Sequence, residues 1–88
     1  MKQKVLSGEA VAVWWTDARG FGGTMSIEEL KMHAGGLPML SIGLLVQDND
    51  SAILLAQDYY ITTDGQARIR DGYVIPKKYI AKMRKWKL

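Results

Sequence analysis

The sequence predicts a mostly β fold, a small and strongly bent five-stranded barrel with one short helix inserted between strands 1 and 2. Two polar turns, at residues 48–51 and 63–66, divide the apolar runs of the second half, and a proline turn at residues 75–80 precedes a basic tail. With 88 residues, 48% of them hydrophobic, the chain can form one small core that buries about 60–65% of the unfolded surface. We therefore expect residues 1–88 to form a single domain, with residues 17–38 as an inserted glycine-rich loop and short helix.

The first strand is predicted at residues 9–16, where both alternating sets of side chains are apolar. One set is Val11, Val13 and Trp15, and the other is Ala10, Ala12 and Trp14. Because successive side chains of a strand point to opposite faces, this strand is expected to be apolar on both faces. One of the adjacent tryptophans should then lie in the core and the other against the helix or a partner chain.

The insertion that follows is predicted to contain a helix of eight or nine residues. Three glycines within residues 20–23 interrupt regular structure. Ser26, with Glu29 three positions later, matches a capping box at the start of a helix. Ile27, Leu30 and Ala34 would share one face of it. Since so short a helix is not stable alone, we expect this apolar stripe to pack on the barrel.

The next three strands are predicted at residues 39–47, 51–61 and 67–75. Gly43 lies in the middle of the first, where a missing side chain permits a bend or the close packing of a crossing strand. The last of the three is expected to kink at Asp71 and Gly72 and to end at Pro76, which cannot donate to a ladder. The side chains expected to be buried together are Ile42, Leu44, Val46, Ile53, Leu55 and Ile75.

The final segment, residues 80–88, fits either a helix or a strand, and we predict a strand. In a bent sheet of five strands, residues 67–75 and 80–88 would then be the edges, with backbone groups open to another chain. The candidate oligomer interface residues are Ile69, Tyr73, Met83, Trp86 and Leu88. Pairing the last strand of one copy with the fourth strand of the next is a head-to-tail contact, which closes into a ring when the rotation permits.

Positive charge is concentrated at the end of the chain. Residues 73–88 hold six basic residues and no acid, whereas residues 1–72 hold six basic and nine acidic residues. The six cations are Lys77, Lys78, Lys82, Arg84, Lys85 and Lys87. They are candidates for contacts with nucleic-acid phosphates. The alternative is that lysines protect an exposed sheet edge from unwanted pairing.

Residues 40–88 resemble the two-part motif of the Sm-like (LSm) proteins. The matching features are Gly43 within an apolar strand, the acidic turn after it, and the short turn between Ile75 and Ile80. The resemblance implies an SH3-like barrel, self-association into a ring and RNA binding. It adds Asn49 to the candidate nucleic-acid residues, although RNA-binding members carry this asparagine later, in the third strand. The chain is also similar to short phage proteins that pair a Trp-x-Asp-Ala segment, here residues 15–18, with a late Ile-Pro-Lys.

The sequence offers little for catalysis or for a cofactor. It has no cysteine and one histidine, His33, with no acidic cluster at metal-ligand spacing. The glycine-rich loop lacks the Lys-Ser or Lys-Thr of a phosphate-binding loop. No apolar run approaches the roughly 20 residues that span a bilayer. We therefore predict no catalytic residue, metal, cofactor, small-molecule substrate or membrane association, and a cytoplasmic location, in a bacterial host if the chain is phage-encoded.

Two functional hypotheses follow. The first is a non-enzymatic Sm-like barrel that forms a homo-oligomeric ring, with RNA as the partner that the family resemblance implies. The second is a phage structural or adaptor protein that docks on a larger assembly and binds no nucleic acid.

Overall fold

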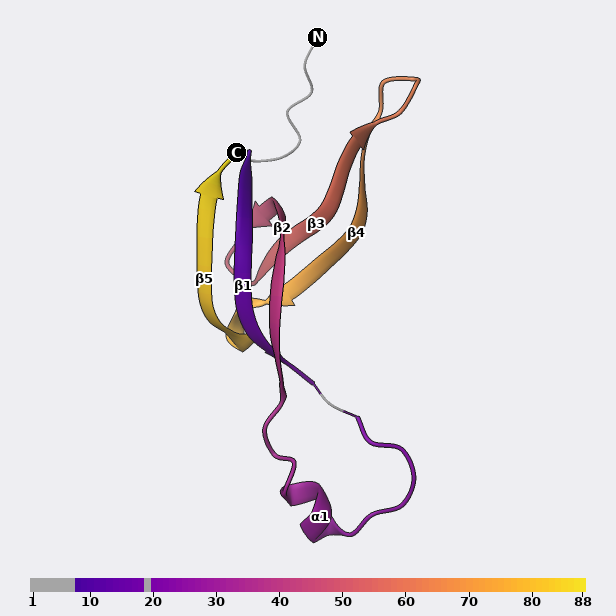
Figure 1. Cartoon of the computed structure of the whole chain (residues 1–88), viewed down its shortest axis with the longest axis vertical. Helices are drawn as coiled ribbons and strands as arrows, with labels where there is room; N and C mark the ends of the chain where they lie inside the picture. The colour runs from indigo at the N-terminus through magenta and orange to yellow at the C-terminus, as the bar shows by residue number, and fades with distance from the viewer. Residues whose placement is uncertain (1–7, 19) are drawn as a thin grey trace.

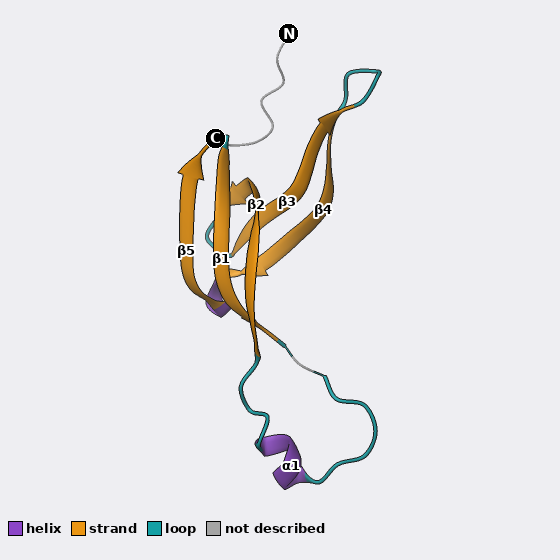
Figure 2. Cartoon of the chain, viewed as in Figure 1, coloured by secondary structure: helices purple, strands orange, loops and turns teal. Residues whose placement is uncertain are grey.

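The computed structural model describes residues 8–18 and 20–88, and these form one antiparallel sheet of five strands with two short helical segments (Figures 1 and 2). The strands are β1 (Glu9–Asp17), β2 (Leu37–Asp48), β3 (Ala52–Ile61), β4 (Ala67–Pro76) and β5 (Ile80–Lys87), and the helical segments are α1 (Ile27–Lys31) and the 3₁₀ turn η1 (Lys77–Tyr79). The mostly β prediction is confirmed, and so is the choice of a strand for the last segment. No described helix has the length and apolar character needed to span a membrane.

The strand order is β4-β3-β2-β1-β5, so β5 returns to pair with β1. The two edges of the sheet are therefore β4 and β5, as the sequence predicted. They do not pair with each other in the part of the chain that the structure describes, so the sheet is open. Closure into a barrel remains a prediction.

The sheet curls around a core on its concave side. The buried cluster is Val11, Val13, Leu45, Ile53, Leu55 and Ile75, with Trp15, Ile80 and Met83 packed against it. The cluster contains side chains of both β1 and β4. In a flat sheet these strands would lie three strand spacings apart, about 14 Å, so the sheet must be strongly curved to bring them together. Gly43 contributes to the bend as predicted, since a Cβ there would lie 2.7 Å from the Ala56 carbonyl oxygen. A register shift between Leu45 and Gln47 bends β2 further.

The predicted inner face of β2 is wrong. Ile42 is 51% exposed, whereas Leu45 is 3% exposed and lies in the core. Leu44 and Val46 are half-buried, while the predicted burial of Ile53, Leu55 and Ile75 is confirmed. The reason is the register with β1, which pairs Val11 with Gly43 and Val13 with Ser41. Because Val11 and Val13 face the core, the odd-numbered residues of β2 beside them face it too.

The residues between β1 and β2 form an arm that leaves the sheet at one end, with α1 at its tip (Figure 1). The capping box is confirmed: Ser26 Oγ accepts from the Glu29 N–H, and the Ser26 N–H donates to Glu29 Oε1. However, α1 has five residues rather than eight or nine, and none of them is buried. The prediction that this helix packs on the sheet is therefore wrong.

The direction of the arm is set at its base. The β1–β2 ladder continues to the pair Asp17–Leu37, beyond the end of the core. Next to it, a Cβ on Gly36 would lie 2.2 Å from Thr16 Cγ2 and 2.5 Å from the Asp17 carbonyl oxygen, so the two sides of the arm meet without room for a side chain. The radius of gyration, 17.2 Å, exceeds the value of about 12 Å for a compact chain of this length.

Candidate assembly edges and basic surface

The outward backbone groups of β5 can be assigned from one hydrogen bond at its end. The Leu88 N–H donates to the Gly8 carbonyl oxygen at 3.0 Å. In an antiparallel ladder, the residues that bond the partner alternate with residues whose N–H and C=O point away. Counting back from Leu88, the backbone groups of Lys87, Lys85 and Met83 point away from β1, toward the open edge.

The same count applies to β4. The Thr62 N–H donates to the Gln66 carbonyl oxygen at 2.8 Å, at the turn that joins β3 to β4. At this end of β4 the backbone groups of Ala67 and Ile69 point away from β3. At the other end the Lys77 N–H donates to the Ser51 carbonyl oxygen, so the alternation is reversed there: the Tyr73 backbone faces β3 and that of Val74 points away. Asp71, in the middle of this edge, has a φ of 55°. This left-handed value agrees with the kink that the sequence predicted there.

The predicted interface residues divide between the edges and the core. Ile69 and Tyr73 are exposed on β4, and Trp86 and Leu88 are exposed at the end of β5. Met83 is different, because its side chain packs against the core. At position 83 the side chain is partly buried, and the outward backbone is the main group available to a neighbouring chain.

The six predicted cations do not form one patch. Lys82 and Arg84 lie on the convex side of β5, whereas Lys85 and Lys87 alternate with them on the other side. Lys77 and Lys78 lie in η1. The alternation of β5 and the turn before it therefore separate charges that are continuous in the sequence.

Two of these cations bind a carboxylate within the chain. Lys77 Nζ lies 2.5 Å from Asp48 Oδ1, and Lys85 Nζ bonds Asp48 Oδ2. The hydrogen bond from Lys77, followed by that from Lys85, lowers the pKa of the Asp48 carboxyl below its ordinary value. The Lys77 N–H also donates to the Ser51 carbonyl oxygen at 2.9 Å. Lys77 and Lys85 thus tie η1 and β5 to the end of β2.

Asn49 is also engaged within the chain. Its Oδ1 accepts from the N–H groups of Ser51 and Ala52, both at 2.9 Å, and its side-chain amide donates to Gln47 Oε1 at 3.2 Å. This is an Asx-type turn. Asn49 therefore shapes the connection between β2 and β3, and its side-chain oxygen is already used as an acceptor.

The convex side of β5, β1 and β2 carries apolar and basic side chains, and we call it the outer face. Its three cross-strand rows are Leu44-Ala10-Trp86, Ile42-Ala12-Arg84 and Leu40-Trp14-Lys82. The alanines are covered by their larger neighbours, whereas Leu40, Ile42 and Trp86 are exposed. Lys82 Nζ lies 4.8 Å from the centroid of the Trp14 ring, a cation–π contact. No acidic residue belongs to these rows.

Sequence reasoning missed the outer face because it placed Ile42 and Leu44 in the core. A usable indication was present in β1, where both alternating sets are apolar. A strand of that kind needs an apolar neighbour on each face, and β2 supplies both.

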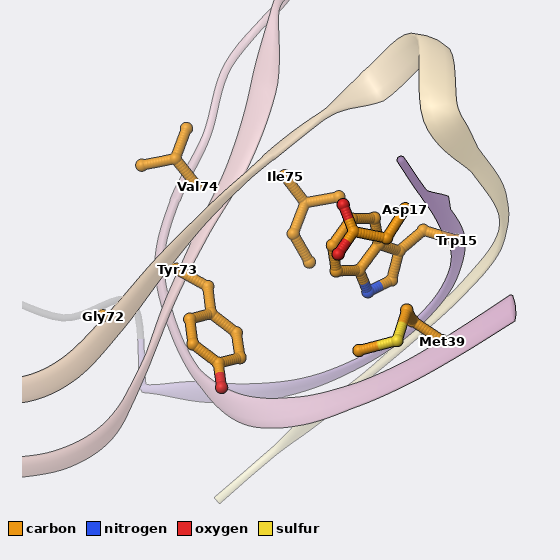
Figure 3. Close-up of a pocket in the computed structure, with 7 residues that line it drawn as sticks. All are labelled: Trp15, Asp17, Met39, Gly72, Tyr73, Val74 and Ile75. Carbon is orange, nitrogen blue, oxygen red and sulfur yellow. The ribbon is translucent and has the colours of Figure 1, made fainter. Parts of the chain in front are cut away.

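A hollow on the concave side lies between the ends of β1 and β2 and the strand β4 (Figure 3). Its lining residues are Trp15, Asp17, Met39, Gly72, Tyr73, Val74 and Ile75. The side chains of Trp15, Asp17, Met39 and Ile75 gather inside it, whereas Val74 points away (Figure 3). The indole N–H of Trp15 donates to the buried Ser41 Oγ at 3.0 Å. The hollow is mainly apolar with one carboxylate, and it adjoins the β4 edge.

The remaining sequence candidates lie on the arm. His33 is exposed, and its ring centroid lies 4.7 Å from that of Phe21, so the two rings link the sides of the arm. Among the described residues, no group of three or more histidine, cysteine, aspartate or glutamate side chains is placed to hold a metal ion. Comparisons of the chain with protein families, with curated proteins and with solved structures found no match.

Proposed function

We propose that this chain is a non-enzymatic assembly protein whose copies join edge to edge, with β5 of one copy against β4 of the next. The observation that carries the proposal is the outward-facing backbone of these two edges. Unpaired N–H and C=O groups of an edge strand are a template for pairing with another chain. Because β4 and β5 lie at opposite ends of the strand order, the contact is head-to-tail and repeats from copy to copy.

The side chains at the edges support this proposal over a purely protective role for the lysines. Lys85 binds Asp48, and Lys82 lies over Trp14, so both are held against the chain itself. Trp86 and Leu88 meanwhile expose apolar surface at one edge, and Ile69 and Tyr73 do so at the other. Apolar side chains beside an open backbone favour association, and the charges of Arg84 and Lys87 on the same strand do not cover them.

We further propose that the head-to-tail contact closes into a ring, as in the Sm-like proteins that residues 40–88 resemble. The strand order and the inward bend at Gly43 fit this proposal. Under the adaptor hypothesis, the isolated protein is a monomer and binds only to a larger assembly of another protein.

Two substitutions at one position test the edge contact. Lys85→Ala removes the ion pair with Asp48, whereas Lys85→Pro also removes the outward N–H of residue 85. Light scattering should be recorded in about 150 mM salt, where charges are screened beyond about 8 Å. We expect a particle several times the monomer mass for the wild type and Lys85→Ala, and a folded monomer for Lys85→Pro. Equal masses for the two variants, or a monomeric wild type, would contradict edge pairing.

RNA binding is a second candidate, favoured by Lys82 and Arg84 on the outer face beside Trp14 and Trp86. Aromatic rings next to cations can stack bases and contact phosphates. If this face binds single-stranded RNA, replacing Lys82 and Arg84 together by alanine should lower the slope of log K against log salt by about 1.4 units, at roughly 0.7 per phosphate contact. The matched control is Lys77→Ala, because Lys77 is engaged by Asp48. A wild-type protein that binds no RNA at low salt would eliminate this candidate.

A further inference from the structure

The arm and the outer face are two exposed apolar surfaces of the same chain. On the arm, Ile27 is 71% exposed, Leu30 is 52% exposed and Met32 is 83% exposed. A helix of five residues is far below the length that is stable in water without tertiary contacts. The complete capping box sets where α1 begins, but it provides no surface for these side chains to cover. The apolar side chains of α1 are therefore exposed and available for contact with another apolar surface.

The sheet of the same chain does not supply that surface. The ladder from β1 and β2 runs on to Asp17 and Leu37, and the contact of Gly36 with Thr16 closes the base of the arm. These contacts direct the arm along the strands and away from the sheet (Figure 1). To fold back onto the outer face, the chain would have to break the end of this ladder.

The outer face is complementary to α1 in its apolar surface and in its charge. Leu40 and Ile42 of β2 expose apolar side chains on it. The cations Lys82 and Arg84 of β5 lie at the other end of the same two rows, across β1, and none of the three rows contains an acid. The arm helix carries Glu28 and Glu29 in its first turn, next to Ile27 and Leu30. Apolar surface can thus meet apolar surface while carboxylates meet cations, which fixes the orientation of a contact more than its strength.

We propose that α1 of one copy docks on the outer face of a second copy, with Ile27 and Leu30 against Leu40 and Ile42, and with Glu28 near Arg84. This contact rests on the proposed self-association and names a second surface for it. It is structurally separate from edge pairing, because it uses side chains on the face of β5, β1 and β2 rather than the open backbone of β4 and β5. A copy that uses both surfaces contacts more neighbours than a copy in a simple ring.

Cross-linking between two variants tests the placement directly, because the native chain has no cysteine. Leu30→Cys protein is mixed with Ile42→Cys protein of different mass and treated with an oxidant. We expect a mixed disulfide dimer to form in preference to either homodimer. The matched control pairs Leu30→Cys with Tyr60→Cys, an exposed position on β3 outside the three rows. Equal yields for the two pairs would overturn the proposal.

Charge exchange tests the orientation. Glu28→Lys and Arg84→Glu should each weaken self-association about tenfold, or about 1.4 kcal/mol, and a protein that carries both changes should recover the wild-type level. Lys31→Glu, on the same helix, is the control for altered helix charge and should not weaken association. Failure of the double variant to recover would overturn the predicted pairing of Glu28 with Arg84.

The outcomes also separate this contact from edge pairing and from RNA. A smaller particle for Lys85→Pro, together with a Leu30–Ile42 cross-link that still forms in the presence of Lys85→Pro, would confirm both contacts as independent. If Lys85→Pro reduces the particle mass but the Leu30–Ile42 disulfide does not form, edge pairing is retained and arm docking is overturned. If single-stranded RNA protects Ile42→Cys from a thiol reagent while the cross-link is absent, the outer face binds nucleic acid instead.

Discussion

The curled sheet and the arm are stabilised in different ways, although both are built from the same apolar residue types. In the sheet, Val11, Val13 and Ile53 are fully buried by side chains from neighbouring strands. In the arm, α1 has no buried residue, and its local order comes from the capping box and the Phe21–His33 contact. The comparison indicates that the buried core of the sheet supplies the stability of the monomer, whereas the arm contributes local order and no buried apolar side chain from α1.

The largest expected difference between the two regions comes from removing leucine side chains. Leu55→Ala, in the core at 1% exposure, should lower the free energy of unfolding by about 2–5 kcal/mol because it leaves a cavity. Leu30→Ala, on the arm, should change it by less than about 0.5 kcal/mol in dilute monomer, as for other surface positions. Urea unfolding of both variants measures this. Similar losses would show that the arm packs on the sheet in solution.

Adding a methyl group at glycine gives the next largest difference. Gly43→Ala should destabilise by about 1–3 kcal/mol, the cost typical of overpacking, because its Cβ would lie 2.7 Å from the Ala56 oxygen and 2.8 Å from Leu55 Cδ1. Gly22→Ala, on the arm, meets no atom within 4 Å and should be neutral or slightly stabilising. Thermal unfolding of the pair checks the prediction. If Gly43→Ala left the unfolding temperature unchanged, β2 and β3 would approach each other less closely at this position than the 2.7 Å contact requires.

The smallest expected effect concerns the ion pairs that fasten η1 and β5 to β2. Hydrogen bonds from Lys77 and then Lys85 lower the pKa of Asp48. A carboxylate of this kind stabilises the fold above its unfolded pKa of about 3.9, and the stabilisation is lost as the pH falls through the lower folded pKa. Asp48→Asn should therefore be less stable than the wild type at neutral pH, and the gap should close below about pH 4.

The measurement for Asp48 is urea unfolding of both proteins across the acid range, with Asp50→Asn as the control in the adjacent turn. A gap that stays constant from neutral pH to strongly acidic pH would contradict the prediction. It would assign the effect of Asp48 to shape rather than to charge.

Much of the local structure was predictable from the sequence because short-range chemistry determines it. The polar turns at residues 48–51 and 63–66, the proline after Ile75 and the capping box at Ser26 locate the ends of elements with little reference to the rest of the chain. That residues 67–75 and 80–88 form the two edges does not follow from chain order alone, because it depends on the last strand pairing with the first. The basic strand and the exposed apolar residues of both edges could also be named in advance.

The candidate surfaces were only partly predictable. The charges of residues 77–87 are contiguous in the sequence, but the two faces of β5 and the turn η1 divide them. Asp48 and Lys85 are 37 positions apart, and only the curl of the sheet brings them into contact. Asn49, which the family resemblance added, is used by the turn. Which lysine pairs with which acid depends on the distance between them in the folded chain. The alternation of residues along a strand does not give that distance.

The sequence by itself determined the strands, their turns and the apolar character of β1 on both faces. The tertiary structure decided which apolar face became the core, because the register with Val11 and Val13 turned Leu45 inward and left Leu40 and Ile42 on the outer face. It also decided that α1 stands away from the sheet, since the ladder at Asp17 and Leu37 and the close contact at Gly36 set the direction of the arm. The alternation of side chains along a strand assigns residues to two faces of the sheet. Only the direction in which the sheet bends decides which face becomes the buried, concave one.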